Sequence, residues 1–323
     1  MTNYGPSSAF VIFGGRNVST EFFSLDEQVE QALTQANGLS ESMLRHLPVG
    51  EAKVDLQAVN GFYDDDTTKL LTALQGNGAS RQLISYGVAG FTQGCDCVLM
   101  DGVFGVKLGR VASRDDLTKL NAKYVGSGSY YRGHIIHPPT AETSASSNNQ
   151  ATSFDRNNSP EIPRVVITSS SVANPTVITT ASSHGLTTGD VVMIENHSGS
   201  TPAVSGQYTV TVTSTTTFTV PVNVTVGGTG GTVKKLSQVN GVADLHLCGL
   251  TLVGYTSVTV KVRHSTDNIT FTDLATFTNV TAIHQTNRQT ITGTINRYLA
   301  ISWLFNGSGS GQSITPYVAI SNT

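Results

Sequence analysis

The residues best suited by type to hold a metal are two cysteines and two histidines in the first half of the chain. Cys95 and Cys97 have one residue between them, and His134 and His137 have two. Zinc sites usually draw on cysteines with two to four residues between them. A single intervening residue on a strand places both sulfurs on one face, which is unusual for zinc. We therefore expect two half-buried thiols and a polar strand end, with no metal and no cofactor.

No group of residues in the sequence has the pattern of a catalytic centre. His184 lies in a stretch rich in Ser, Thr and Gly without a nucleophile or a placed carboxylate, so we expect it in a turn. Asp64, Asp65 and Asp66 precede a helical pattern and are expected to cap that helix rather than to bind a cation. The sequence lacks a phosphate-binding loop, a nucleophile elbow and a His-Glu-x-x-His pair. We expect that the chain is not an enzyme.

The composition favours extended β-structure with hydroxyl-bearing outer faces. Charged residues make up 13% of the 323 residues, about half the usual share, and Thr, Ser, Gly and Asn take their place. Residues 1–165 contain 13 Lys/Arg and 17 Asp/Glu, a balance of −4, whereas residues 166–323 contain 6 and 5, a balance of +1. A nucleic-acid-binding protein needs a basic surface, so tight binding of DNA is not expected.

The cysteine content and the amino-terminal residues point to a reducing compartment. Three cysteines are too few for a disulfide framework in a chain of 323 residues. The longest apolar run near the start, Ala9–Phe13, is far too short for a signal peptide or a membrane span. We expect synthesis in a cytoplasm and no association with a membrane.

One strand of the first unit carries a regular row of polar residues. Within Gly50–Tyr63, apolar and polar residues alternate with a period of two, so one face is expected to be buried. The opposite face is a candidate lumen-facing or inter-subunit surface. Its residues are Glu51, Lys53, Asp55 and Gln57.

Two helices are expected beside the strands of the first unit. Ser24 and Glu27 form a capping box, apolar residues then recur at helical spacing, and Gly38 ends the run. A second helix is expected at Thr67–Gln75, where Gly76 stops it. Further strands are expected at Ile84–Ala89, Cys97–Val111 and Leu117–Ile136.

Changes in composition divide the chain into three units. Residues 1–163 form the first domain, and its last part, 138–163, reads as a polar linker or surface loop. Residues 164–236 contain short strands at near-regular spacing, which predicts a small barrel or sandwich. Residues 237–323 predict a carboxy-terminal β-sandwich in which Val258, Val260 and Val262 face one way; Trp303, the only tryptophan, is expected to anchor its core.

Several stretches resemble proteins of phage tails. In the first domain they are Phe10-Val11-Ile12-Phe13-Gly14-Gly15, Gly50-Glu51-Ala52-Lys53-Val54 and Val59-Asn60-Gly61-Phe62-Tyr63-Asp64-Asp65. These stretches resemble the major tail, or tail-tube, proteins of siphophages, and so do the polar segment from Thr140 to Asn158 and residues 258–268 and 296–303. Residues 176–226, through the motif at 183–192, resemble a small β-module of many phage tail and structural proteins, here placed as an insertion expected to project outward.

The resemblance implies a mainly β fold with minor α: a tail-tube-type β-sandwich with a flanking helix, plus two small all-β domains. It also implies a role as a structural subunit that forms stacked, hexameric rings of the tail tube, through which DNA leaves the capsid. The expected partners are further copies of the chain, the tape measure, tail terminator and tail tip proteins, and DNA in passage, all in the virion tail. It implies no catalytic residues.

Three alternative functions remain open on the sequence. A tail-tip or receptor-binding protein with glycan-binding β-domains would need exposed aromatics, for which Tyr130, Tyr131 and Tyr255 are available. A capsid decoration protein would share the Thr- and Val-rich composition. An enzyme acting on cell-wall polymer would need an acid/base pair, and none can be singled out.

Overall fold

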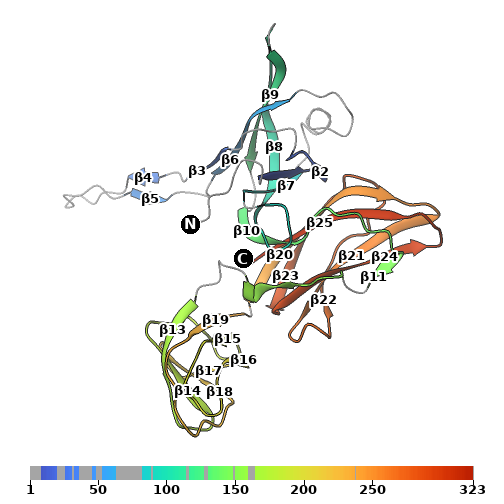
Figure 1. Ribbon diagram of the computed structural model, residues 1–323. Coiled ribbons are helices and arrows are strands. Elements are labelled where there is room, and N and C mark those ends of the chain that lie inside the picture. Colours follow the sequence, from blue (N-terminus) through green and yellow to red (C-terminus); the bar gives the residue numbers. More distant parts are fainter. Residues whose placement is uncertain are drawn as a thin grey trace.

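The protein is almost entirely built of β-strands. The computed structural model describes residues 9–19, 26–30, 33–35, 46–48, 53–62, 82–88, 90–113, 116–126, 130–147, 150–158, 164–236 and 238–322. In these residues the one helical element with assigned bounds is the short 3₁₀ helix η3, Arg156–Asn158. The predicted mainly β fold is therefore confirmed, and its strands form three larger sheets and one small hairpin (Figure 1).

The largest sheet has eleven strands that come from both halves of the chain. These are β1 (Phe10–Phe13), β2 (Arg16–Asn17), β3 (Asp26–Glu30), β6 (Lys53–Phe62), β7 (Gln82–Gly87), β8 (Asp96–Ser113), β9 (Asp116–Gly126), β10 (Tyr130–His137), β20 (Gln238–Thr251), β23 (Thr286–Ile295) and β25 (Ser313–Asn322). The main path runs β2-β1-β7-β8-β10-β25-β20-β23, and all pairs are antiparallel. Strands from residues 1–163 and 237–323 thus share one sheet.

The main path of this sheet curls until it is nearly a closed barrel. Ser85 on β7 and His246 on β20 have three strands between them along the path, yet their side chains are hydrogen-bonded at 2.9 Å. The apolar part of the interior is one cluster of buried residues: Phe10, Ile12, Cys97, Leu99, Ile135, Val242, Tyr317 and Ala319. Burial of these side chains is the main favourable contribution to closing the sheet.

A second sheet of five strands packs on the outside of the barrel wall. Its strands are β11 (Ser146–Ser147), β12 (Phe154–Asp155), β21 (Tyr255–Ser265), β22 (Thr272–Thr276) and β24 (Tyr298–Gly307). The core between the two sheets includes Ala243, Leu245 and Leu247 of β20 and Val318 and Ile320 of β25. Since Val242, Tyr317 and Ala319 face the barrel interior, β20 and β25 are buried on both faces, as their alternation requires.

The described residues between 138 and 158 contact the five-stranded sheet at several points. β11 and β12 both pair with β24, and the Gln150 side chain accepts a hydrogen bond from the Ile301 amide at 3.1 Å. Trp303 is 4% exposed, and its Nε1 donates to the Ser144 carbonyl at 3.1 Å. The expectation that Trp303 anchors the core is confirmed.

The third sheet is a separate unit built from consecutive strands. It contains β13 (Arg164–Ser170), β14 (Thr176–Thr180), β15 (Val191–Glu195), β16 (Gly206–Thr209), β17 (Thr211–Val212), β18 (Thr217–Val220) and β19 (Thr232–Lys235). Their order is β16-β15-β19-β13-β14-β18-β17, and in the described residues they pair only with one another. They enclose a core of their own around Ile178, Phe218 and Val233.

The helix predicted from Ser24 to Gly38 is wrong. Asp26–Glu30 is strand β3, which pairs with β6 from Asp26↔Gln57 to Glu30↔Lys53, and Leu33–Gln35 is strand β4, which pairs with β5 (His46–Pro48). A short isolated helix is only marginally stable, and the long strand β6 offers a full ladder of backbone partners instead. The flanking helix of the predicted fold is therefore replaced by strands here. The helix predicted at Thr67–Gln75 lies outside the described residues.

The other strands predicted for the first unit lie where they were expected, except that one predicted strand is two strands. Lys53–Phe62 falls inside the strand predicted at Gly50–Tyr63, and β7 and β8 overlap the next two predicted strands. The single strand predicted at Leu117–Ile136 is two strands, β9 and β10. They pair with different parts of β8, so the chain must turn between them.

Candidate functional site: an open sheet edge and a buried polar junction

The long strand β8 leads out of the barrel into a second ladder of strands. Its first part pairs with β7 and β10, and its later part, from Val103 to Ser113, pairs with β9. β9 pairs in turn with β6, and β6 with β3, so that the ladder runs β8-β9-β6-β3 (Figure 1). β3 has no second strand partner in the described residues and ends this ladder. Such an edge presents a row of unpaired backbone groups.

Three of the four residues proposed for a polar face lie on β6. Lys53, Asp55 and Gln57 have Glu30, Gln28 and Asp26 as their partners on β3, while Glu51 lies outside the described residues. β6 has strand partners on both sides, so its backbone is not the edge that a neighbouring subunit could extend. Whether these side chains face a lumen or another subunit stays a prediction.

The interior of the barrel holds an ion pair that was not predicted from the sequence. Asp244 on β20 and Arg288 on β23 are direct cross-strand partners, and the guanidinium binds the carboxylate through two hydrogen bonds of 2.7 and 2.6 Å. The Asp244 side chain is fully buried. Burial raises the pKa of Asp244, while Arg288 acts in the opposite direction. Asp101 of β8, 3.8 Å from Arg288, and the Tyr131 ring of β10 complete the surroundings of the guanidinium.

A second buried polar contact joins the two ends of the barrel wall. The Gly15 amide donates to Nδ1 of His246 at 3.4 Å, so this nitrogen is an acceptor and Nε2 carries the proton. Nε2 then donates to Oγ of Ser85 at 2.9 Å. A histidine that is already protonated at this nitrogen cannot accept the serine proton. The Ser–His pair therefore has the wrong tautomer for an activated nucleophile.

Burial also keeps His246 neutral. Loss of hydration, together with the positive charge of Arg288, lowers the pKa of His246 to about 3. The edge of the imidazole packs against the Tyr317 ring with the centroids 5.6 Å apart. These contacts make His246 a structural link between β20, the β1–β2 turn and β7.

Acidification is expected to destabilise the barrel through His246. The unfolded chain takes up a proton at pH 6.5 and the folded chain only near pH 3, so the free energy of unfolding falls by about 1.4 kcal/mol per pH unit between them. The raised pKa of Asp244 acts in the opposite direction at the acid end of this window. Urea denaturation at pH 7.5, 6.5 and 5.5 should show the loss, and His246→Gln should remove most of it.

The control for this pH experiment concerns three other histidines, His134, His264 and His284. Partial or full burial lowers their pKa values as well, so part of the acid sensitivity should survive in the His246→Gln variant. An unchanged pH slope in His246→Gln would contradict the assignment of the main effect to His246.

The cysteines and histidines considered for zinc do not gather into a common site. His134 Nδ1 lies 3.1 Å from the Asp96 carboxylate, and His137 donates from Nδ1 to the Pro316 carbonyl at 3.0 Å. Cys97 is buried and Cys95 half-buried, both as free thiols. No cluster of three or more His, Cys, Asp or Glu suited to a metal occurs in the part of the chain that the structure describes.

The remaining residues singled out in the sequence have structural partners. His184 lies in the loop after β14, where its Nδ1 accepts from the Leu186 amide at 3.0 Å, while the turn of this loop comes later, at Thr188 and Gly189. Tyr131 packs beside Arg288, and the Tyr255 hydroxyl donates to the Gly309 carbonyl at 3.0 Å. Asp64–Asp66 lie outside the described residues.

Asp244 and His246 could have been found from the alternation of the sequence. In Val242–Cys248, polar residues stand at every second position between apolar ones, which is typical of a strand with one polar face. That this polar face would be buried opposite β7 and β8 depends on pairing between segments more than 140 residues apart.

Comparisons with known proteins give little further information. No protein-family model and no curated protein matches the chain. Among solved structures, the Dit (gp 19.1) protein of phage SPP1, described as a paradigm of the hub adsorption apparatus in phages that infect Gram-positive bacteria, aligns with 98% of this chain and 99% of its own. The identity is 8% and the TM-score 0.28, which does not establish a common fold. No helix in the described residues is long and apolar enough to cross a membrane.

Proposed function

We propose that this chain is a structural subunit of a long-tailed phage tail and forms stacked rings of the tail tube. The observation that carries the proposal is the edge of β3, which ends the β8-β9-β6-β3 ladder and has no second strand partner in the part of the chain that the structure describes. An exposed strand edge in a soluble protein is normally shielded or paired, and a second copy of the chain can pair with it. The resemblance of residues 10–65 and 258–303 to tail-tube proteins supports the same function.

Pairing at β3 leads to a ring if the contact is head-to-tail. The edge of β3 on one subunit would bind a different surface on the next, and such a heterologous contact closes into a ring when the rotation between subunits fits. A second, axial contact that does not close would stack the rings into a tube. Six subunits per ring, as in the family that the sequence resembles, form part of the proposal.

The charge distribution suits a channel for DNA. The balance of −4 over residues 1–165 would repel phosphate, so that DNA passes without binding. We place Glu51, Lys53, Asp55 and Gln57 at the lumen or at a subunit contact, and tape measure, tail terminator and tail tip proteins as partners in the virion tail. No catalytic activity forms part of the proposed function.

We also propose that residues 164–236 form a domain of their own that projects from the tube wall. Its seven strands pair with one another, and its base is tied to η3 by side chains. Arg156 donates to the Leu236 carbonyl at 2.9 Å, the buried Lys234 donates to the Asn157 carbonyl, and Asn157 donates to Glu195 at 2.9 Å. Both ends of the insertion thus lie close to η3, which an insertion between adjacent regions requires.

Electron microscopy of the purified full chain tests the assembly. We expect rings or tubes of uniform diameter with density for residues 164–236 outside the wall. Proline replacements on β3 locate the contact, because neighbouring residues of an edge strand direct their amides to opposite sides. One of the two variants Gln28→Pro and Val29→Pro removes a backbone amide that points away from β6. That variant should abolish rings, and its thermal unfolding should be unchanged.

The alternative functions give different images. Discrete trimers would favour a receptor-binding protein, which the polar groove described below makes the second candidate. A monomer at all concentrations, or rings that persist in both proline variants, would overturn assembly through β3.

A further inference from the structure

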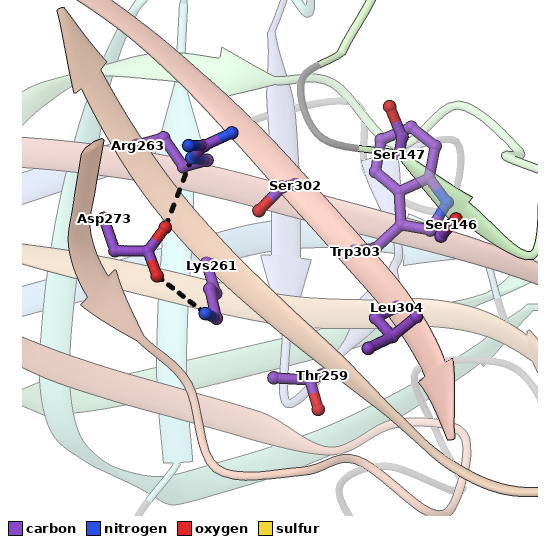
Figure 2. Close-up of a pocket in the computed structure, with 9 residues that line it drawn as sticks. All are labelled: Ser146, Ser147, Thr259, Lys261, Arg263, Asp273, Ser302, Trp303 and Leu304. Atoms are coloured by element: carbon purple, nitrogen blue, oxygen red, sulfur yellow. Dashed lines mark hydrogen bonds and ion pairs between the residues drawn. The ribbon is translucent and has the colours of Figure 1, made fainter. Parts of the chain in front are cut away.

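The outer face of the five-stranded sheet carries a polar groove that no contact within the described residues fills. The groove has a volume of about 510 Å³ and runs over β21 and β24 (Figure 2). Thr259, Lys261 and Arg263 alternate with the buried valines of β21, so these three side chains share the outer face. Ser302 and Leu304 of β24 stand opposite Lys261 and Thr259 in the register. β11, through Ser146 and Ser147, forms one wall.

Two residues of this groove are available to a ligand. Ser302 lines the groove, and none of the hydrogen bonds between described residues involves its hydroxyl. Leu304, two residues further along the same face, is 52% exposed. A ligand with a hydroxyl group and an adjacent apolar C–H surface would satisfy both residues.

The charged residues of the groove are held in fixed positions. The Asp273 carboxylate accepts from Nζ of Lys261 at 2.6 Å and lies 3.2 Å from Nε of Arg263 (Figure 2). Arg263 also donates to the Phe271 carbonyl. One carboxylate therefore holds two cations in place, and the groove keeps a net positive charge of one. This charge favours an acidic ligand, in a protein whose overall charge is −3.

A second hollow of about 440 Å³ lies at the other end of the same sheet face. Tyr298 is on the same face as Ser302 and Leu304, since the three positions differ by even numbers of residues along β24. Phe271, Asn268, Ser153 and Asp155 line the hollow with it. Arg297 lies over the Tyr298 ring and pairs with the Asp155 carboxylate, so the charge of this carboxylate is compensated. The aromatic, amide and hydroxyl groups of the hollow are suited to the C–H faces and hydroxyls of a sugar ring. The six residue steps from Tyr298 to Leu304 span roughly 20 Å.

We propose that this face, from Ser146 and Leu304 at one end to Tyr298 and Phe271 at the other, binds an acidic oligosaccharide lengthwise. The hydroxyl of Ser302 and the cations Lys261 and Arg263 bind its hydroxyl and carboxylate groups. Leu304 and Tyr298 contact its C–H faces at the two ends. The site is distinct from the β3 edge, so the inference does not depend on the proposed tube.

Affinity electrophoresis of the full chain in gels that contain polygalacturonate, with dextran as the neutral polymer, tests the site. We expect retardation by polygalacturonate that is at least fivefold stronger than by dextran. Lys261→Gln and Leu304→Ser should each weaken binding to polygalacturonate at least fivefold. Arg164→Gln removes one positive charge outside the groove and is the control for Lys261→Gln. Val253→Ser removes a similarly exposed apolar side chain and is the control for Leu304→Ser. Both controls should leave binding unchanged.

Three outcomes would overturn the proposal. These are no retardation by polygalacturonate, equal retardation by both polymers, and an equal loss of binding in Arg164→Gln and Lys261→Gln. The last result would indicate attraction by overall charge instead of a site. Circular dichroism of each variant checks that the fold is retained.

Discussion

Replacing Arg288 with leucine is expected to lower the free energy of unfolding by about 3–5 kcal/mol, because it leaves the carboxylate of Asp244 buried and unpaired. Asp244 is fully buried, and the two hydrogen bonds from Arg288 are the contacts that stabilise its charge. Urea denaturation followed by the fluorescence of Trp303, the only tryptophan, measures the effect in the core next to this wall.

Two further variants separate the buried charge from other effects of the Arg288→Leu substitution. The double variant Asp244→Leu/Arg288→Leu removes both charges and should recover most of the lost stability, since apolar replacement of a buried pair is often neutral. Lys261→Ala breaks an exposed ion pair with Asp273 and should cost less than about 1 kcal/mol. If the double variant were as unstable as Arg288→Leu, the loss would come from packing and not from the unpaired charge.

Replacing Gly133 with alanine is expected to disrupt the joint between the two halves of the chain. Gly133 lies on β10 opposite Ser321 of β25, and a Cβ atom there would come within 2.1 Å of the Ile320 carbonyl oxygen. Because the obstructing atom belongs to the backbone of a strand buried on both faces, it cannot move aside as a flexible side chain would. We expect a loss of about 3 kcal/mol or more, measured by the same denaturation.

The matched control is a glycine with free space around it. Gly311 has a φ of +77°, and a Cβ atom added there meets no atom within 4 Å. Gly311→Ala should therefore cost only the strain of a left-handed alanine, about 1–2 kcal/mol. Equal losses in the two variants would show that the close approach of Gly133 to Ile320 does not determine the stability of this joint.

The features that were predictable from the sequence depend on short-range alternation. Val258, Val260 and Val262 were expected to face one way, and all three are at most 1% exposed, with Lys261 and Arg263 on the opposite face. The placement of Trp303 in a core followed from the same pattern. In such strands the residue types alone distinguish the buried face from the exposed one.

The features that were missed depend on contacts between distant segments. The Ser24–Gly38 region has helical spacing, yet β3 forms because β6 supplies a strand partner. His246 and Asp244 gain their surroundings from Gly15, Ser85 and Arg288. The groove around Ser302 likewise needs β11, which comes from a segment read as a polar linker. Local pattern carries no information about such long-range pairing.

β20 and β25 are buried on both faces, and this also determines how the chain would transmit mechanical force. A pull applied to the five-stranded sheet reaches the barrel through β20 and β25, so many backbone hydrogen bonds share the load. The base of residues 164–236 is tied through a few side-chain bonds at η3, among them those of Arg156 and Lys234. Under tension, the barrel and the five-stranded sheet would behave as one rigid body, and the inserted unit would swing on its base.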